Sequence, residues 1–161
     1  MARRILAPFV VTLALIGCGQ QQSTQAQVPC DTPVCTMAVK ITGDCSDPDH
    51  IVVDKAEHWI KKNNHDVRLV WEIKTAGYEW VPAVPDSITS GGITFTAPPP
   101  PPPAPPAASE FTKPSSTHTT YELKDANSAQ VPTPYKYDVH IQTKEGKLCA
   151  VKDPVIKNGA S

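Results

Sequence analysis

The sequence predicts an all-β sandwich, and three observations favour this fold class. Short runs of alternating apolar and polar residues recur along the chain, which is the pattern of half-buried strands. Turn-forming residues separate these runs. No segment of the presumed domain carries the apolar stripe of a long amphipathic helix. About seven or eight short strands arranged in this way are typical of a β-sandwich.

Each expected strand has its own signal. Apolar side chains fill alternate positions of 67–73, with Arg68 and Glu72 between them, and Trp71 is expected in the core. Segment 54–62 fits two structures, because it combines the spacing of a helix capping box with an alternation that suits an edge strand, and we expect a strand. The expected strands, in chain order, cover 36–41, 51–53 with its continuation through 54–62, 67–73, 78–81, 93–95, 119–123, 135–141 and 148–151.

The end of the chain predicts a terminal hairpin. Apolar and polar residues alternate from Tyr135 to Ile141, and the turn at 144–147 leads into the expected strand at 148–151. Pro154 follows this strand and has no backbone N–H to donate. We therefore expect Pro154 to end the last strand of the sandwich.

The first 17 residues have the layout of a secretory signal peptide. Arg3 and Arg4 precede an apolar run from Ile5 to Ile16, and a small glycine follows the run. About a dozen apolar residues are too few for a membrane-spanning helix, which needs about 20. We expect a targeting segment that is removed after export.

The positions Leu15-Ile16-Gly17-Cys18 resemble the lipobox of bacterial lipoproteins. The resemblance implies that the chain is cut before Cys18 and that lipid on this cysteine, such as palmitate, holds the protein on a membrane. In that family an aspartate after the cysteine marks retention at the inner membrane, and Gly19 stands here instead. The resemblance therefore implies the outer membrane, facing the periplasm. The alternative is a secreted protein in which Cys18 is incidental.

These signals divide the chain into a signal peptide at 1–17, a lipidated cysteine and flexible tether at 18–29, and a β-sandwich domain at 30–158 with a Pro-rich loop at 97–117. The tether is polar and has little to bury, so it is expected to be disordered. Its eleven residues after the cysteine reach at most about 36 Å. The domain is therefore expected to stay near the membrane surface.

A proline run lies inside the expected loop. Pro98 to Pro106 holds eight prolines in nine positions, and such a run predicts a polyproline II rod about 28 Å long. We favour a stiff spacer within an irregular loop. The alternative is a ligand for an aromatic groove on a partner protein.

With Cys18 assigned to lipid, four cysteines remain: Cys30, Cys35, Cys45 and Cys149. An even number in an exported chain predicts two disulfides, and sequence alone allows three connectivities. We expect Cys30 with Cys35 and Cys45 with Cys149, because the second pair would join the end of the first strand to the last strand. A zinc site is the alternative, but no pair of short Cys-x-x-Cys motifs supports it.

Two further resemblances concern the domain. The strand pattern makes an Ig-like or a cupredoxin-like sandwich the expected architecture, and the segment from Ile51 to Trp71 resembles the paired early strands of cupredoxin-like domains. The alternation from Tyr135, together with the closing 153–158, resembles small uncharacterised bacterial β-sandwich proteins and implies no activity. A type 1 copper site needs two histidines, a thiolate and usually a methionine. No histidine follows Cys149 closely and Met37 is far upstream, so we expect no copper.

Two other groups of residues are candidate metal ligands. His58 and His65 flank the turn at 63–64, but nothing in their spacing requires a metal, and we expect isolated surface histidines. Asp44, Asp47 and Asp49 lie in one short loop and could supply oxygen ligands to calcium. The loop lacks the central glycine and distant glutamate of an EF-hand. We expect ordinary turn acids, no metal and no cofactor.

The sequence contains none of the local catalytic motifs of serine hydrolases, zinc proteases or phosphate-binding loops, and we expect no enzyme. The formal net charge is −1, and no basic patch indicates a nucleic-acid partner. We expect a membrane-anchored periplasmic lipoprotein that acts as a binding or structural module, with an envelope protein as its partner. The alternatives are a metal-binding cupredoxin-like protein and a periplasmic inhibitor or immunity protein.

Overall fold

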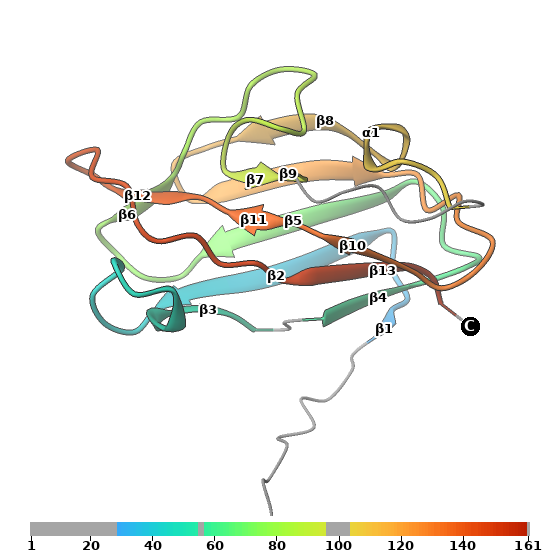
Figure 1. Cartoon of the computed structure of the whole chain (residues 1–161), viewed down its shortest axis with the longest axis horizontal. Helices are drawn as coiled ribbons and strands as arrows, with labels where there is room; N and C mark the ends of the chain where they lie inside the picture. Colours follow the sequence, from blue (N-terminus) through green and yellow to red (C-terminus); the bar gives the residue numbers. More distant parts are fainter. Residues whose placement is uncertain (1–28, 55–56, 96–103, 161) are drawn as a thin grey trace, which may run out of the picture.

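The computed structural model describes residues 29–54, 57–95 and 104–160. Strands dominate this part of the chain, and two main sheets pack against each other around one apolar core (Figure 1). The expected all-β sandwich is confirmed. The two helices among the described residues are short, namely η1 (Pro48–His50) and α1 (Ala107–Glu110). No helix in the described ranges has the length and apolarity needed to cross a membrane.

The larger sheet has five strands and includes the strand with the clearest sequence pattern. The parallel β2–β5 pair lies at its centre, and the neighbouring strands run antiparallel to this pair. Alternate side chains of the central strands enter the core, as the two-residue period requires. In spatial order its strands are β3 (Ile51–Val53), β2 (Val34–Ile41), β5 (Val67–Ile73), β9 (Thr120–Asp125) and β8 (Phe111–Ser116).

The second layer begins with a four-stranded sheet. Its spatial order is β1 (Pro29–Cys30), β4 (Glu57–Lys61), β13 (Val155–Ala160) and β10 (Thr133–Lys136). Two short strands continue the path of β10 across the same layer, and each pairs with an earlier segment (Figure 1). These pairs are β11 (Asp138–Val139) with β7 (Ile93–Thr94), and β12 (Ile141–Thr143) with β6 (Tyr78–Trp80).

Trp71 joins the two layers at the centre of the core. Its side chain is fully buried, which confirms the sequence prediction. The indole Nε1–H donates a hydrogen bond to the hydroxyl of Tyr137 at 3.1 Å, and the two rings meet edge to face with centroids 5.4 Å apart. The core therefore satisfies the polar atom of Trp71 while it buries the ring.

The last strand differs from the sequence prediction. Pro154 was expected to end the final strand, but the six residues that follow it form β13, which lies between β4 and β10. Pro154 sits just before the paired positions, so its missing N–H removes no ladder hydrogen bond. The expected end of the sandwich is therefore wrong, and β13 is an internal strand of the second layer.

The expected strand at 148–151 is also wrong. This segment is joined to its neighbours by isolated bridges that include Gln142 with Leu148. The N–H of Cys149 donates to the carbonyl of Ile141, whereas the N–H of Ala150 turns away to the carbonyl of Cys45. The backbone therefore leaves the ladder to reach the loop that follows β2.

Part of the expected Pro-rich loop is regular structure. Within 97–117, the structure forms α1 and then β8, which pairs antiparallel with β9 at the sheet edge. Lys113 has a φ of 54°, and the register shifts between Thr112 and Ser115. An edge strand accommodates such a bulge and the adjacent Pro114 without losing internal ladder bonds. The expected polyproline rod falls mostly on 96–103, outside the described residues.

Candidate functional site

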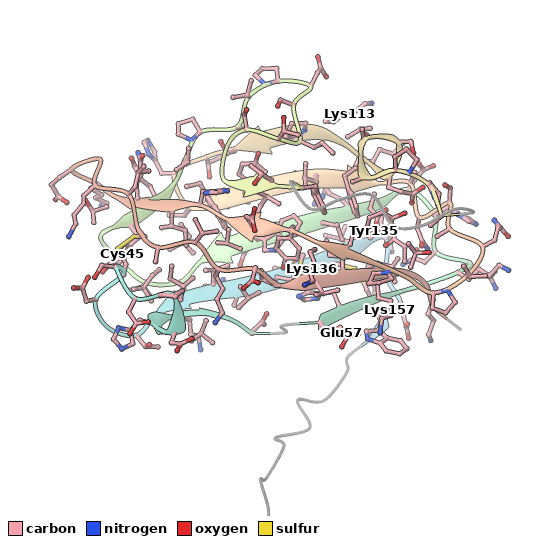
Figure 2. The ribbon with its side chains drawn as sticks, in the orientation of Figure 1. Cys45, Glu57, Lys113, Tyr135, Lys136 and Lys157 are labelled. Atoms are coloured by element: carbon pink, nitrogen blue, oxygen red, sulfur yellow. A yellow bond between two sulfur atoms is a disulfide. The ribbon has the colours of Figure 1, made fainter. Side chains whose placement is uncertain are left out.

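The four domain cysteines form two disulfides. Cys45 is joined to Cys149 with their Cα atoms 4.9 Å apart, and Cys30 is joined to Cys35 with a Cα separation of 5.9 Å. These are the two pairs expected from the sequence. The first ties the loop after β2 to the segment before β13, at one end of the sandwich (Figure 2). It also leaves no thiolate at Cys149 for a copper site. Cys18 lies outside the described residues.

The candidate metal ligands have other partners in the fold. His58 is buried on β4, whereas His65 is exposed and its Nδ1 contacts the carbonyl of Asn127 at 3.1 Å. The carboxylate of Asp44 accepts the N–H of Ser46, and that of Asp47 accepts an N–H that begins η1. Among the described residues, no group of three or more His, Cys, Asp or Glu side chains could hold a metal ion.

A surface hollow of about 240 Å³ lies where β6 approaches the end of β8. The carboxylate of Glu79 is held there by two donors: Gln142 Nε2 at 2.8 Å and His118 Nδ1 at 2.7 Å. Both hydrogen bonds lower the pKa of the Glu79 carboxyl group, and the bond from Gln142 has the larger effect. The lining residues are Glu79, Trp80, Pro82, Ser116, Thr117 and His118.

The hollow contains both hydrogen-bond acceptors and hydrogen-bond donors. Glu79 keeps an anionic acceptor at its wall, and the side chain of His118 is 88% exposed. Trp80 is buried, and its indole Nε1 has no hydrogen-bond partner. The hydroxyl of Ser116 accepts the backbone N–H of Ala83, which fixes the rim. Such a surface can bind a small polar group or a side chain of a partner protein.

A second polar cluster is fully enclosed. Glu110 at the end of α1 and Asp125 at the end of β9 are both 0% exposed. Asn158 of β13 bridges them, since its Nδ2 donates to Glu110 Oε2 at 3.1 Å and to Asp125 Oδ1 at 2.8 Å. The N–H and hydroxyl of Ser128 also donate to Glu110. Three separate segments of the chain therefore meet at one buried pair of carboxyl groups.

Asn127 extends this cluster to the turn after β4. Its Nδ2 donates to the carbonyls of Lys61 at 2.7 Å and Asn64 at 2.8 Å, and its Oδ1 accepts the N–H of Gly159 at 2.8 Å. The residue adopts a φ of 45°, a conformation that asparagine tolerates better than most residues. Asn127 thereby fastens β13 to β4 and to the end of β9.

No protein-family model matches this chain, and no curated protein matches its sequence.

Sequence reasoning missed both clusters, although one signal for the buried one was present. Tyr121, Leu123, Asp125 and Asn127 occupy alternate positions, so the two polar residues continue the inward face of β9. A carboxylate in register with core residues indicates burial. The hollow had no such signal, because Glu79 and His118 come from segments distant in the sequence.

Proposed function

We propose that the protein is a membrane-anchored lipoprotein of the bacterial cell envelope that acts as a binding or structural module. The observation that carries the proposal is the N-terminal sequence, in which Arg3 and Arg4, an apolar run and Leu15-Ile16-Gly17-Cys18 follow in the order of a lipoprotein signal. The disulfide between Cys45 and Cys149 supports export, because such bonds persist in oxidising compartments.

The proposed anchor limits where the domain can act. The described domain begins at Pro29, on edge strand β1 and opposite Trp59 of β4. The residues between Cys18 and Pro29 span at most about 36 Å when fully extended. We propose that the domain works within this distance of the membrane, with a partner that is itself part of the envelope.

We propose the hollow beside Glu79 as the contact surface of this module. Its ionised carboxylate and the exposed His118 ring present polar groups next to the apolar wall of Trp80. A partner that inserts an amide or an ammonium group would be oriented by these groups. Contact, and not catalysis, is the role that this arrangement supports.

The anchor is tested by expressing the wild-type chain, Cys18→Ser and Gly19→Asp in a Gram-negative host. Signal cleavage, incorporation of labelled fatty acid and membrane fractionation are then followed. We expect lipid only on the forms that keep Cys18, with the wild type in the outer membrane and Gly19→Asp in the inner membrane. If the wild type and Cys18→Ser both gave a soluble product without lipid label, the proposed anchor would be overturned.

The contact surface needs a separate test with the intact lipoprotein. Cells that carry the wild type, Glu79→Gln or Glu72→Gln are treated with a short crosslinker, and the adducts are compared. Glu72 is the matched control, because this half-buried glutamate of β5 pairs with Lys74. We expect a discrete adduct that Glu79→Gln abolishes and Glu72→Gln keeps. An adduct unchanged by Glu79→Gln would remove the hollow from the proposal.

A further inference from the structure

Hydrogen-bond donors are unevenly distributed over the enclosed pair of carboxyl groups, Glu110 and Asp125. Glu110 accepts three hydrogen bonds, two from Ser128 and one from Asn158. Asp125 also accepts two, from the N–H of Asn127 at 2.9 Å and from Asn158, but both reach Oδ1. Its Oδ2 is buried without a hydrogen-bond partner. The donors therefore concentrate on Glu110, and one buried oxygen of Asp125 has none.

The lysines and arginines of the described residues do not neutralise this pair. Each ion pair that the structure shows for these cations joins a different acid, such as Glu57 for Lys157 on β13 and Asp66 for Lys124 on β9. Two adjacent carboxylates that are removed from water and share one amide cannot both ionise without a large cost. Protonation of one member relieves that cost.

The directions of the pKa shifts agree with this geometry. Burial, with a smaller contribution from the charge of Glu110, raises the pKa of Asp125 to about 7. Burial first, and then the two carboxyl groups, also raise the pKa of the Tyr135 hydroxyl, so that this side chain stays neutral. Asp125 is thus the group of the cluster that changes charge near neutral pH.

We propose that Glu110, Asp125 and Asn158 form a proton-operated latch, which holds the end of β13 and α1 against β9 while Asp125 carries a proton and loosens when the proton leaves. The contacts define what the latch holds. Asn158 and the neighbouring Gly159 belong to β13, and both are bound through this cluster. Glu110 ends α1, and its own carbonyl accepts the N–H of Ala126 after β9.

Other titratable side chains lie around the latch, but their contacts with it are indirect or absent. Tyr135 of β10 donates its hydroxyl to the carbonyl of Pro105 at 2.8 Å and so ties the segment before α1 to the second sheet. His65 contacts the cluster only through the carbonyl of Asn127, and Lys61 only through its own carbonyl. His58 is buried on the inner face of β4, in register with Ile156. Asp125 is the group with both a direct contact to Asn158 and an unpartnered buried oxygen.

The latch is tested by hydrogen–deuterium exchange of the full chain in its soluble Cys18→Ser form, from about pH 5 to about pH 8 and corrected for intrinsic exchange. One proton released on opening increases the opening equilibrium constant by roughly tenfold per pH unit below the folded pKa. We expect the protection of peptides covering 104–110 and 155–160 to fall by this factor as the pH rises, and to level off above about pH 7. A pH-independent protection of these peptides would overturn the latch.

Two variants separate the latch from general destabilisation. Asp125→Asn keeps an oxygen for both hydrogen bonds and carries no charge, so its protection should be pH-independent. Glu122 is the control position, because it lies on the same strand and pairs with Arg68. The variant Glu122→Gln should keep the wild-type pH dependence. If the protection of Asp125→Asn depended on pH as steeply as that of the wild type, the proposal would be contradicted.

A further measurement does not depend on whether a variant folds. Infrared difference spectra of the folded protein near pH 6 should contain the carbonyl band of a protonated, solvent-shielded carboxyl group, and this band should disappear above pH 8. Absence of that band would also overturn the latch.

Discussion

Loss of the disulfide between Cys45 and Cys149 should destabilise the domain far more than loss of the disulfide between Cys30 and Cys35. The first closes a loop with a sequence separation of 104 residues, and the second spans 5 residues. In the chain-entropy model these loops correspond to about 4.7 and about 2 kcal/mol of stabilisation at 25 °C. The expected difference of about 2.7 kcal/mol comes from the unfolded chain, because the longer loop excludes more of its conformations.

Urea unfolding of the two double-alanine variants measures this difference, with the free energy of unfolding taken from the linear extrapolation. Cys35 and Cys45 are both nearly buried, so each variant loses a similar small apolar contact and the comparison cancels it. The variant without the long-range bond should also have the larger m-value, since its unfolded state expands more. Equal losses in the two variants would refute the assignment of the stabilisation to loop closure.

Three other predictions concern single side chains. Trp71→Ala should lower the free energy of unfolding by about 3 to 5 kcal/mol, because it empties the core and leaves the Tyr137 hydroxyl without its donor; a loss below about 1 kcal/mol in urea unfolding would contradict this. Between about pH 4 and about pH 7 the folded state keeps the Asp125 proton that the unfolded state releases, since the folded pKa is raised from 3.8 to about 7. The free energy of unfolding should therefore fall as the pH rises through this window, by at most about 4 kcal/mol, and Asp125→Asn should remove the slope. Gly159→Ala should cost clearly more than Gly146→Ala, because both glycines have positive φ but only the new Cβ at Gly159 would lie within 2.7 Å of two carbonyl oxygens; equal melting temperatures for the two variants would contradict the close approach.

Much of the fold could be predicted because its inward face alternates cleanly. Met37, Val39 and Ile41 on β2 and alternate apolar positions of β5 from Val67 to Ile73 follow the two-residue period, and the structure buries them. The segment 54–62 was ambiguous from its pattern, and the structure forms a strand over Glu57–Lys61. Burial of one face was the signal in each case.

The missed strands carry residues that weaken this signal. β13 places Asn158 where a strand pattern requires an apolar side chain, and Pro154 before it was taken as a terminator. β8 contains Lys113 in a left-handed conformation and the adjacent Pro114. In both strands tertiary contacts, with the buried carboxyl pair or with the sheet edge, outweigh the local preference.

The sites were harder to predict than the strands for the same reason. Glu110, Asp125 and Asn158 come from three segments, and only Asp125, in register with the buried residues of β9, carries a local signal of burial. Only the antiparallel pairing of β9 with β8, together with the position of β13, brings them together. A polar residue in register with a buried face is the sequence signal that such a cluster leaves.

The proposed anchor is tested most directly by mass spectrometry of the N-terminal peptide of the protein purified from membranes. The account predicts a mature chain that begins at Cys18 and carries a diacylglyceryl group on its sulfur. A mature N-terminus elsewhere, or an unmodified Cys18 in a soluble protein, would contradict it.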